Sequence, residues 1–286
     1  VPNSFKNKYA CFKTNIEGTQ SVIDFYRTIE KDFSTVLHKK ATIEDYTSNK
    51  LTYLIWSFVR VNLSDNTANK LDGVSDVLTN SQDSLITRIN VLYNDYKKKL
   101  DVTDNEMSLS VTTFDNRLKN NTDWYYTENF GKDLPDKAYQ YFLNNSVYLN
   151  DVANYEVASL RNHLPTSINF ITIAKDLYID LSKYLSIEID SKIVGDITNL
   201  RSFIGTYQFN DNNNKETFVI MEENGKLKCE STIEGSPKIF SIYPKNAEEF
   251  VLNLRFGKLK RNDQNEVIGI TTTLGSRAAK HYKKIK

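Results

Sequence analysis

Few side chains in this sequence stand at spacings that support catalysis or metal binding. The three histidines, His38, His163 and His281, lie in distant segments, and none has a second His or Cys at the spacing of a zinc site. The two cysteines, Cys11 and Cys229, are also far apart, so a disulfide between them is possible, but free thiols are the more common outcome. We therefore expect no metal site and no cofactor.

Adjacent carboxylates are no better candidates for acid and base chemistry. Glu222 precedes Glu223 and Glu248 precedes Glu249, and each pair stands beside an expected hairpin turn. Neighbouring residues of a strand point to opposite faces, so such a pair does not act together on one substrate. The 10 glycines form no phosphate-binding loop. We therefore name no catalytic residue.

One short segment has the residue types of a recognition surface. Trp124, Tyr125, Tyr126 and Phe130 lie close together in a stretch, 121–135, that breaks the helical pattern. Aromatic side chains with polar tips suit the binding of a sugar, a peptide or a protein. The same side chains would also serve to close the end of a hydrophobic core. Both interpretations stay open from the sequence.

Helical periodicity covers residues 17 to about 190. Apolar residues recur at intervals of four and three in the first of these helices, at Val22, Tyr26, Ile29, Phe33 and Val36. Further helices are predicted at 42–58, 67–79, 81–120 with an interruption near 101–104, 135–144, 146–163 and 165–188. Because apolar stripes need partner helices, we expect an antiparallel helical bundle.

The last third of the chain has the alternation and the turn residues of short strands. Asn224-Gly225 fits a two-residue hairpin, and clusters of Asn, Asp, Gly and Pro recur between apolar runs. Seven or eight strands are predicted, at 206–209, 217–221, 226–229, 239–243, 249–252, 256–261, 266–274 and 281–285. Such strands suit an up-and-down antiparallel barrel, because closure leaves no unpaired edge.

This stretch also resembles a known module, the small lipocalin-like barrel at the C-terminus of many bacterial proteins, including serine hydrolases of the penicillin-binding type. The resemblance lies in the order of six short motifs, Gly205 to Tyr207, Asn224 to Leu227, Ile242 to Pro244, Glu248 to Phe250, Asn265 to Ile270 and Tyr282 to Ile285. It implies an accessory module in a cell-envelope setting. Neither Ser-x-x-Lys nor Lys-Thr-Gly occurs in the chain, so the hydrolase activity is not implied.

The helical part, around residues 141–150, resembles extracytoplasmic regions of uncharacterised membrane-anchored bacterial proteins. No apolar run approaches the roughly 20 residues that span a bilayer. The chain begins with Val1 rather than Met, so we expect a preceding segment, and a signal peptide or a membrane tether would fit. A net charge of +1 argues against binding to nucleic acid.

Closure of the strands would create an interior that is a second candidate site. An eight-stranded barrel is filled by side chains or holds one small ligand. Bulky apolar residues expected to face inward are Phe218, Ile220, Phe240, Ile242 and Phe250. They are large enough to fill the interior themselves.

The sequence therefore predicts an α+β protein, with a helical bundle domain at 1–195 and a seven- or eight-stranded lipocalin-like β-barrel domain at 196–286. The short connection 189–201 contains Gly195 and has no Pro-rich tract, so we expect the barrel to be docked on the bundle. We expect a non-enzymatic interaction or sensor module of the bacterial cell envelope, in the periplasm or at the cell surface, whose partner is an unknown protein or a small apolar ligand. A binder of a small apolar ligand and an enzyme with its site at the domain junction are the alternatives.

Overall fold

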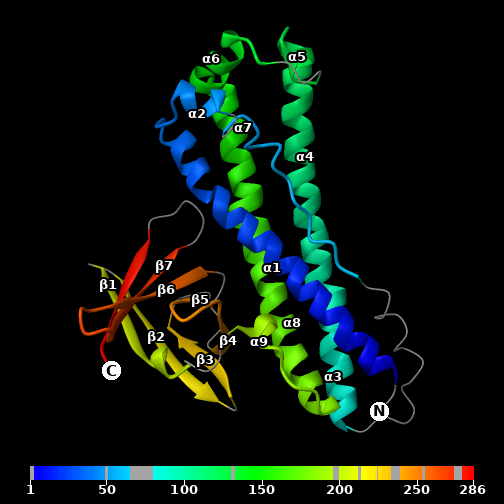
Figure 1. Cartoon of the computed structure of the whole chain (residues 1–286), viewed down its shortest axis with the longest axis vertical. Helices are drawn as coiled ribbons and strands as arrows, with labels where there is room; N and C mark the ends of the chain where they lie inside the picture. Colours follow the sequence, from blue (N-terminus) through cyan, green and yellow to red (C-terminus); the bar gives the residue numbers. More distant parts are fainter. Residues whose placement is uncertain are drawn as a thin grey trace.

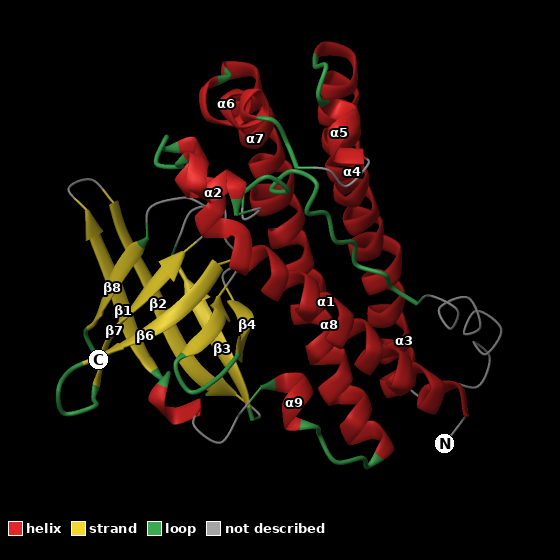
Figure 2. Ribbon diagram, turned by 45° about the horizontal axis from the view of Figure 1, so that its top comes forward, coloured by secondary structure: helices red, strands yellow, loops and turns green. Residues whose placement is uncertain are grey.

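The computed structural model describes residues 3–48, 51–64, 80–129, 133–195, 200–211, 214–223, 225–232, 239–252, 255–273 and 279–286. Helices make up the N-terminal part and strands the C-terminal part, and the two parts lie side by side (Figures 1 and 2). The predicted α+β class is therefore confirmed. Within the described ranges, no helix is long and apolar enough to cross a membrane.

Three long helical rods form the bundle. The helical elements are α1 (Asn3–Leu37), α2 (Ile43–Thr47), α3 (Asn80–Val91), η2 (Leu92–Lys97), α4 (Lys98–Asn121), α5 (Tyr125–Asn129), α6 (Asp136–Asn144), α7 (Ser146–Glu156), η3 (Val157–His163), α8 (Leu164–Leu185), α9 (Ser191–Val194) and η4 (Leu200–Ser202). The rods are α1, α3–η2–α4 and α7–η3–α8. Figure 1 shows that the third rod runs antiparallel to the other two.

The predicted apolar stripe of α1 faces the core. Val22, Tyr26, Phe33 and Val36 are 3% exposed or less, and Ile29 is half-buried against them. α1 packs along α8, α7 and η3, and its Tyr26 hydroxyl lies 3.1 Å from the sulfur of Met107 on α4. One helix face therefore joins the other two rods, as the period of its apolar residues predicts.

Several predicted helix boundaries are wrong. The helix that Thr42 caps ends at Thr47 instead of continuing to residue 58. The rod 80–121 has no break near 101–104, but it contains the π-helical segment η2. The boundary predicted at Pro165 is absent as well, because the rod continues through it. The helix predicted at 67–79 lies outside the described residues.

The π-helical segment η3 gives a physical reason for the continuity at Pro165. Proline has no backbone N–H, and in a regular α-helix its ring clashes with the carbonyl four residues earlier, here that of Arg161. η3 ends at His163, immediately before the turn that holds Pro165. A π turn is wider than an α turn, so it relieves this clash without breaking the rod.

An extended segment, 57–64, crosses the bundle without regular secondary structure. Its backbone groups are paired with buried side chains instead. The Tyr155 hydroxyl donates to the carbonyl of Ser57 at 2.8 Å, and Asn15 both donates to the carbonyl of Ser64 at 3.1 Å and accepts from its N–H at 3.0 Å. These bonds hold the segment on the bundle in place of a ladder.

The strands close into the predicted barrel. They are β1 (Gly205–Asp211), β2 (Asn214–Glu223), β3 (Lys226–Ser231), β4 (Ile239–Pro244), β5 (Glu249–Leu252), β6 (Arg255–Arg261), β7 (Val267–Thr273) and β8 (Lys280–Lys284). Each strand pairs antiparallel with the next, and β8 pairs with β1, where Tyr207 lies opposite Lys284. The antiparallel barrel is therefore confirmed, with eight strands among the described residues.

Alternation along the strands gives the barrel an inner and an outer apolar face. Inward residues form a core of their own, which includes Tyr207 and Phe218. Outward residues of β4, β5 and β6, namely Tyr243, Val251 and Phe256, pack against the core of the bundle. The barrel is thus attached to the bundle through the outer face of three neighbouring strands.

The connection between the two parts is closely packed. Figure 2 shows α9 between the end of α8 and the barrel. Gly195 follows α9 with φ at 88°, and a Cβ at this position would lie 1.9 Å from the carbonyl oxygen of Pro244. The predicted domain boundary after residue 195 stays a prediction, because residues 196–199 lie outside the described ranges.

We expect Gly195→Ala to destabilise the protein by at least ~2 kcal/mol, because alanine resists this φ and its methyl group has no room against Pro244. Urea unfolding of the full chain measures the effect. Gly18→Ala on α1 is the matched control: nothing lies within 4 Å of its added Cβ, so it should stabilise by about 1 kcal/mol. Equal effects of the two substitutions would contradict the close packing at Gly195.

Candidate functional site

The structure separates the aromatic residues of the first predicted site. Trp124 is 4% exposed and packs edge-on against Phe142 in the bundle core. Tyr125 is half-buried, Tyr126 is 61% exposed, and Phe130 lies outside the described residues. Trp124 therefore belongs to the core, and Tyr126 alone of the described aromatics here offers its ring to a partner.

The inward residues predicted for the barrel fill its interior. Phe218, Ile220, Ile242 and Phe250 are each 2% exposed or less, and Phe240 is half-buried beside them. Each of these side chains belongs to, or packs against, one continuous apolar cluster. This packing leaves the lumen to the protein's own side chains.

Both ends of the barrel interior are also occupied. Phe203, just before β1, packs edge-on against Phe250 with ring centroids 5.3 Å apart. Farther along the interior, Glu216 accepts hydrogen bonds from the ammonium of Lys280 and the hydroxyl of Tyr282, both at 2.6 Å. The inward charges thus pair with each other, which removes the main cost of placing them there.

A buried cluster in the bundle has the residue types of a hydrolase triad. His163 Nδ1 lies 3.0 Å from Thr103 Oγ1 and 3.6 Å from Asp104 Oδ1, and His163 Nε2 lies 3.3 Å from Ser167 Oγ. His163 and Ser167 are completely buried, so a substrate has no access to the hydroxyl. Burial lowers the pKa of His163 to about 4 and raises that of Asp104 to about 6. We therefore assign this cluster to the core.

The junction between bundle and barrel is held by the carboxylate of Asp176 on α8. Its Oδ2 accepts from the Ser241 hydroxyl at 2.7 Å, and its Oδ1 accepts from the Tyr243 hydroxyl at 2.5 Å. The ammonium of Lys226 lies 3.3 Å from Asp176 Oδ1 and 3.0 Å from Asp180 Oδ1. Burial and the negative charge of Asp176 raise the pKa of Tyr243 well above its usual range, so its hydroxyl keeps the proton that it donates.

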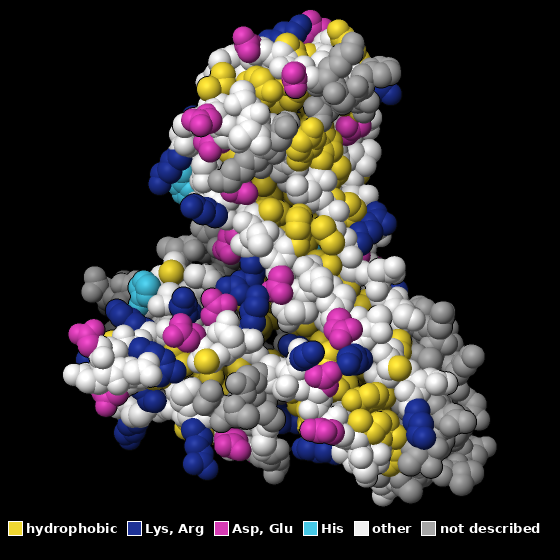
Figure 3. Space-filling model, viewed as in Figure 1, with side chains coloured by type: hydrophobic (Ala, Val, Ile, Leu, Met, Phe, Trp, Pro, Cys, Tyr) yellow, Lys and Arg dark blue, Asp and Glu magenta, His cyan; other side chains and the backbone are white. Residues whose placement is uncertain are grey.

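A second set of charged contacts joins α1 to the turn and strand that follow β4. Lys245 lies 2.5 Å from Asp24, and Arg27 lies 3.5 Å from Glu249 while its guanidinium stacks 4.3 Å from the ring of Phe256. Figure 3 shows charged side chains of both signs gathered where the barrel meets the bundle. The junction is therefore closed, but by polar groups rather than by apolar ones alone.

Lys175 lies inside this junction. It is 8% exposed, and its ammonium lies 5.6 Å from the ring centroid of Tyr243. Burial lowers the pKa of Lys175 to about 8. A buried amine of lowered pKa is a typical nucleophile, but the cavity beside it measures about 10 Å³, the room of a single water molecule. The junction therefore has no space for a substrate.

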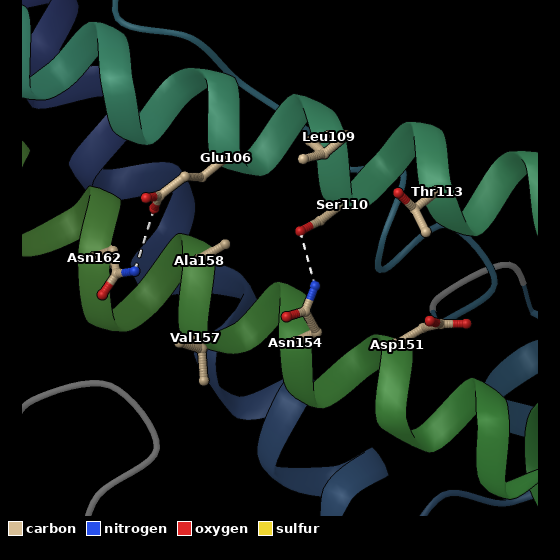
Figure 4. A pocket seen from close by; sticks show the side chains of 9 residues that line it. All are labelled: Glu106, Leu109, Ser110, Thr113, Asp151, Asn154, Val157, Ala158 and Asn162. Atoms are coloured by element: carbon tan, nitrogen blue, oxygen red, sulfur yellow. Dashed lines mark hydrogen bonds between the residues drawn. The ribbon is translucent and has the colours of Figure 1, made fainter.

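An open groove lies between α4 and the α7–η3 segment (Figure 4). Its volume is about 350 Å³. Polar side chains of the two helices meet across it: Asn154 donates to Ser110 at 3.0 Å, and Asn162 donates to Glu106 at 3.3 Å. Because both walls are long helices of the bundle, the groove has a fixed shape.

Apolar residues and a second carboxylate complete the groove. Leu109 on α4 is 67% exposed and Val157 on η3 is 40% exposed. Asp151 lies at the same end of the groove as Thr113 in Figure 4 and is paired with Arg117 through Oδ1, whereas its Oδ2 is buried without a hydrogen-bond partner among the described groups. This combination suits the recognition of another molecule more than it suits catalysis.

Sequence reasoning missed the groove, although one signal was present. The apolar stripe of this rod includes Met107, Val111, Phe114 and Leu118, and Leu109 falls on the opposite side of the helix. One exposed apolar residue on a polar helix face is common, so this signal by itself does not identify a site. Its partner wall could not be predicted, since Val157 is far away in the sequence.

A second depression, of about 400 Å³, lies at one end of the barrel. Its walls are turn residues such as Ala247 and Asn265, and the guanidinium of Arg261 in it donates to the carbonyl of Asn265 at 2.8 Å. The guanidinium of Arg261 is thus used by the turn itself, and Glu248 is the other charged residue that lines the depression. We therefore take the groove between α4 and α7–η3 as the candidate site.

The described residues contain no group of three or more His, Cys, Asp or Glu side chains that could hold a metal ion. Cys11 on α1 and Cys229 on β3 are free thiols. Comparison with known proteins gives no match to a family model, to a curated protein or to a solved structure.

The two neighbouring aromatic residues should respond oppositely to truncation. Trp124→Ala removes a buried ring and should cost about 3 to 5 kcal/mol of stability. Tyr126→Ala changes an exposed ring and should stay within about 0.5 kcal/mol of the parent protein. Thermal unfolding of the full chain distinguishes them. An unchanged melting temperature for Trp124→Ala would contradict the assignment of Trp124 to the core.

Lys175→Met should stabilise the protein at pH 7, by about 1 to 3 kcal/mol. The pKa of Lys175 falls from 10.5 to about 8 on folding, so below pH 8 the folded protein keeps a buried ammonium at a cost. The contribution of Lys175 to stability rises as pH increases from 8 toward 10.5, and the advantage of Met should shrink over that range. Urea unfolding at several pH values measures it.

Lys183→Met, on the exposed side of the same helix, is the matched control and should show neither the gain nor its pH dependence. A loss of stability in Lys175→Met at pH 7 would mean that the ammonium contributes to the junction.

Proposed function

We propose that this protein is a non-enzymatic interaction module, in which the barrel is fixed to the bundle and the groove between α4 and α7–η3 receives a protein partner. The groove carries this proposal. It is open, lies on two rigid helices, and combines exposed apolar residues with polar pairs. These are the properties of a protein interface rather than of a reaction site.

The packing of the barrel supports the proposal, because it leaves little space for a ligand in the lumen or a substrate at the junction. Its inward side chains fill the lumen, which weakens the alternative of a small apolar ligand held there. At the junction, the Lys175 amine has about 10 Å³ beside it, which weakens the alternative of an enzyme with its site between the two parts. Both alternatives require space that these side chains occupy.

The proposed setting is the bacterial cell envelope, at the periplasm or the cell surface. Its support is the resemblance of the strand motifs to accessory barrels of envelope proteins. In this setting a barrel fixed by the bonds of Asp176 would act as a rigid extension of the bundle.

A photoreactive amino acid placed at Leu109, in cells that make the protein, tests the proposal. It should form an adduct with another polypeptide, because this position is 67% exposed in the groove. The same amino acid at Ile239, which is 62% exposed on the barrel, is the control and should form none. The absence of a polypeptide adduct at Leu109, or a small molecule retained by the purified chain in native mass spectrometry, would contradict the proposal.

A further inference from the structure

The groove lies where a fourth helix would complete the bundle. α1 packs on one side of the pair formed by α4 and α7–η3, and Figure 4 views this pair from the other side, with α1 behind it. Bundles of four helices bury such a groove beneath a further helix. The described part of the chain places no helix there.

The apolar residues of the groove follow the spacing of a helix contact. Leu109 is 67% exposed, and Val102, one heptad earlier on the same face of α4, is 56% exposed. Val157 and Ala158 contribute apolar surface from η3. An aliphatic side chain buried against them would gain about 1.5 to 3 kcal/mol.

The charges of the groove are all of one sign. Glu106 and Asp151 are the two ionisable residues among those that line it, and both are acidic. Asp151 already accepts from Arg117 through Oδ1, but its Oδ2 is buried and has no hydrogen-bond partner in the described structure. A buried carboxylate oxygen without a donor is costly, and a cationic group in the groove would offset part of this cost through its charge.

The two carboxylates stand at opposite ends of the groove. Glu106 accepts from Asn162, which lies eleven positions after Asp151 in the same rod, or about 16 Å along the helix axis. A helix laid in the groove would therefore need two basic residues about three turns apart, with apolar residues between them.

We propose that the groove binds one amphipathic helix of a partner protein, whose apolar face is flanked by Lys or Arg residues about three turns apart. This inference rests on the proposed function and names the chemistry of its partner. Leu109 and Val157 bind the apolar face, while Glu106 and Asp151 pair with the basic residues. The acidic lining selects against acidic helices.

A labelled Leu/Lys peptide of about 18 residues tests the inference, with a matched peptide that carries Glu in place of Lys. Fluorescence anisotropy with the full chain should show binding of the Lys peptide and at least ~10-fold weaker binding of the Glu peptide. Leu109→Lys should weaken binding of the Lys peptide by ~10-fold or more, because it removes apolar contact and adds a repelling charge.

Ile239→Lys on the barrel is the matched control, since it makes the same change at a residue of similar exposure. Asp151→Asn should also weaken binding of the Lys peptide, and circular dichroism checks that each variant is folded. Equal binding of the two peptides, or equal weakening by Leu109→Lys and Ile239→Lys, would overturn the inference. So would a dimer of the chain that Leu109→Lys disperses, because a second copy would then occupy the groove.

The outcome is separable from that of the proposed function. If the photoreactive residue at Leu109 captures a polypeptide while neither peptide binds, the interaction module stands and the basic helix is wrong. If no polypeptide is captured, the proposed function itself fails.

Discussion

The arrangement of the two parts depends on the hydrogen bonds and the ion pair that the carboxylate of Asp176 makes with the barrel. It accepts from Ser241 and Tyr243 of β4 and lies beside Lys226 of the neighbouring strand β3. All three donors lie on the outer face of the barrel. Because successive residues of a strand point to opposite faces, the residues between them point into the interior. These bonds, together with the ion pairs of Lys245 and Arg27, thus orient the barrel on the bundle.

A polar junction of this kind specifies position more than it adds stability. Removing one partner of a buried charged pair is costly, whereas replacing the whole set by apolar residues is often neutral. Lys175 illustrates the cost, since burial lowers the pKa of its ammonium. Apolar contacts of Tyr243 and Phe256 with the bundle core supply the non-directional part of the attachment.

The same logic explains the buried polar groups of the bundle. Where the segment 57–64 crosses the helices, its carbonyls need donors, and the hydroxyls of Tyr26 and Tyr155 provide them at Val59 and Ser57. His163 is neutral and bonded on both ring nitrogens, so it too is a structural group. These buried polar groups are therefore used for packing within the protein.

Local patterns in the sequence determined the elements of this protein. The α1 stripe at Val22 to Val36 and the eight strand segments follow from periods of 3.6 and 2, which are properties of neighbours along the chain. The Asn224-Gly225 pair likewise places its hairpin without reference to the rest of the fold. The confirmed α+β class, with its closed antiparallel barrel, rests on these signals.

Only the tertiary structure decided how the elements face one another. In it, Trp124 is buried, Tyr126 is exposed, and a helix continues through Pro165. Leu109 lies near Val157 in the groove, and Asp176 bonds to Tyr243 at the junction. Which side of a helix meets a partner depends on its rotation and register, and these are set by the summed packing of many distant side chains. No period within one segment contains that information, so the groove and the junction could not be predicted from the sequence.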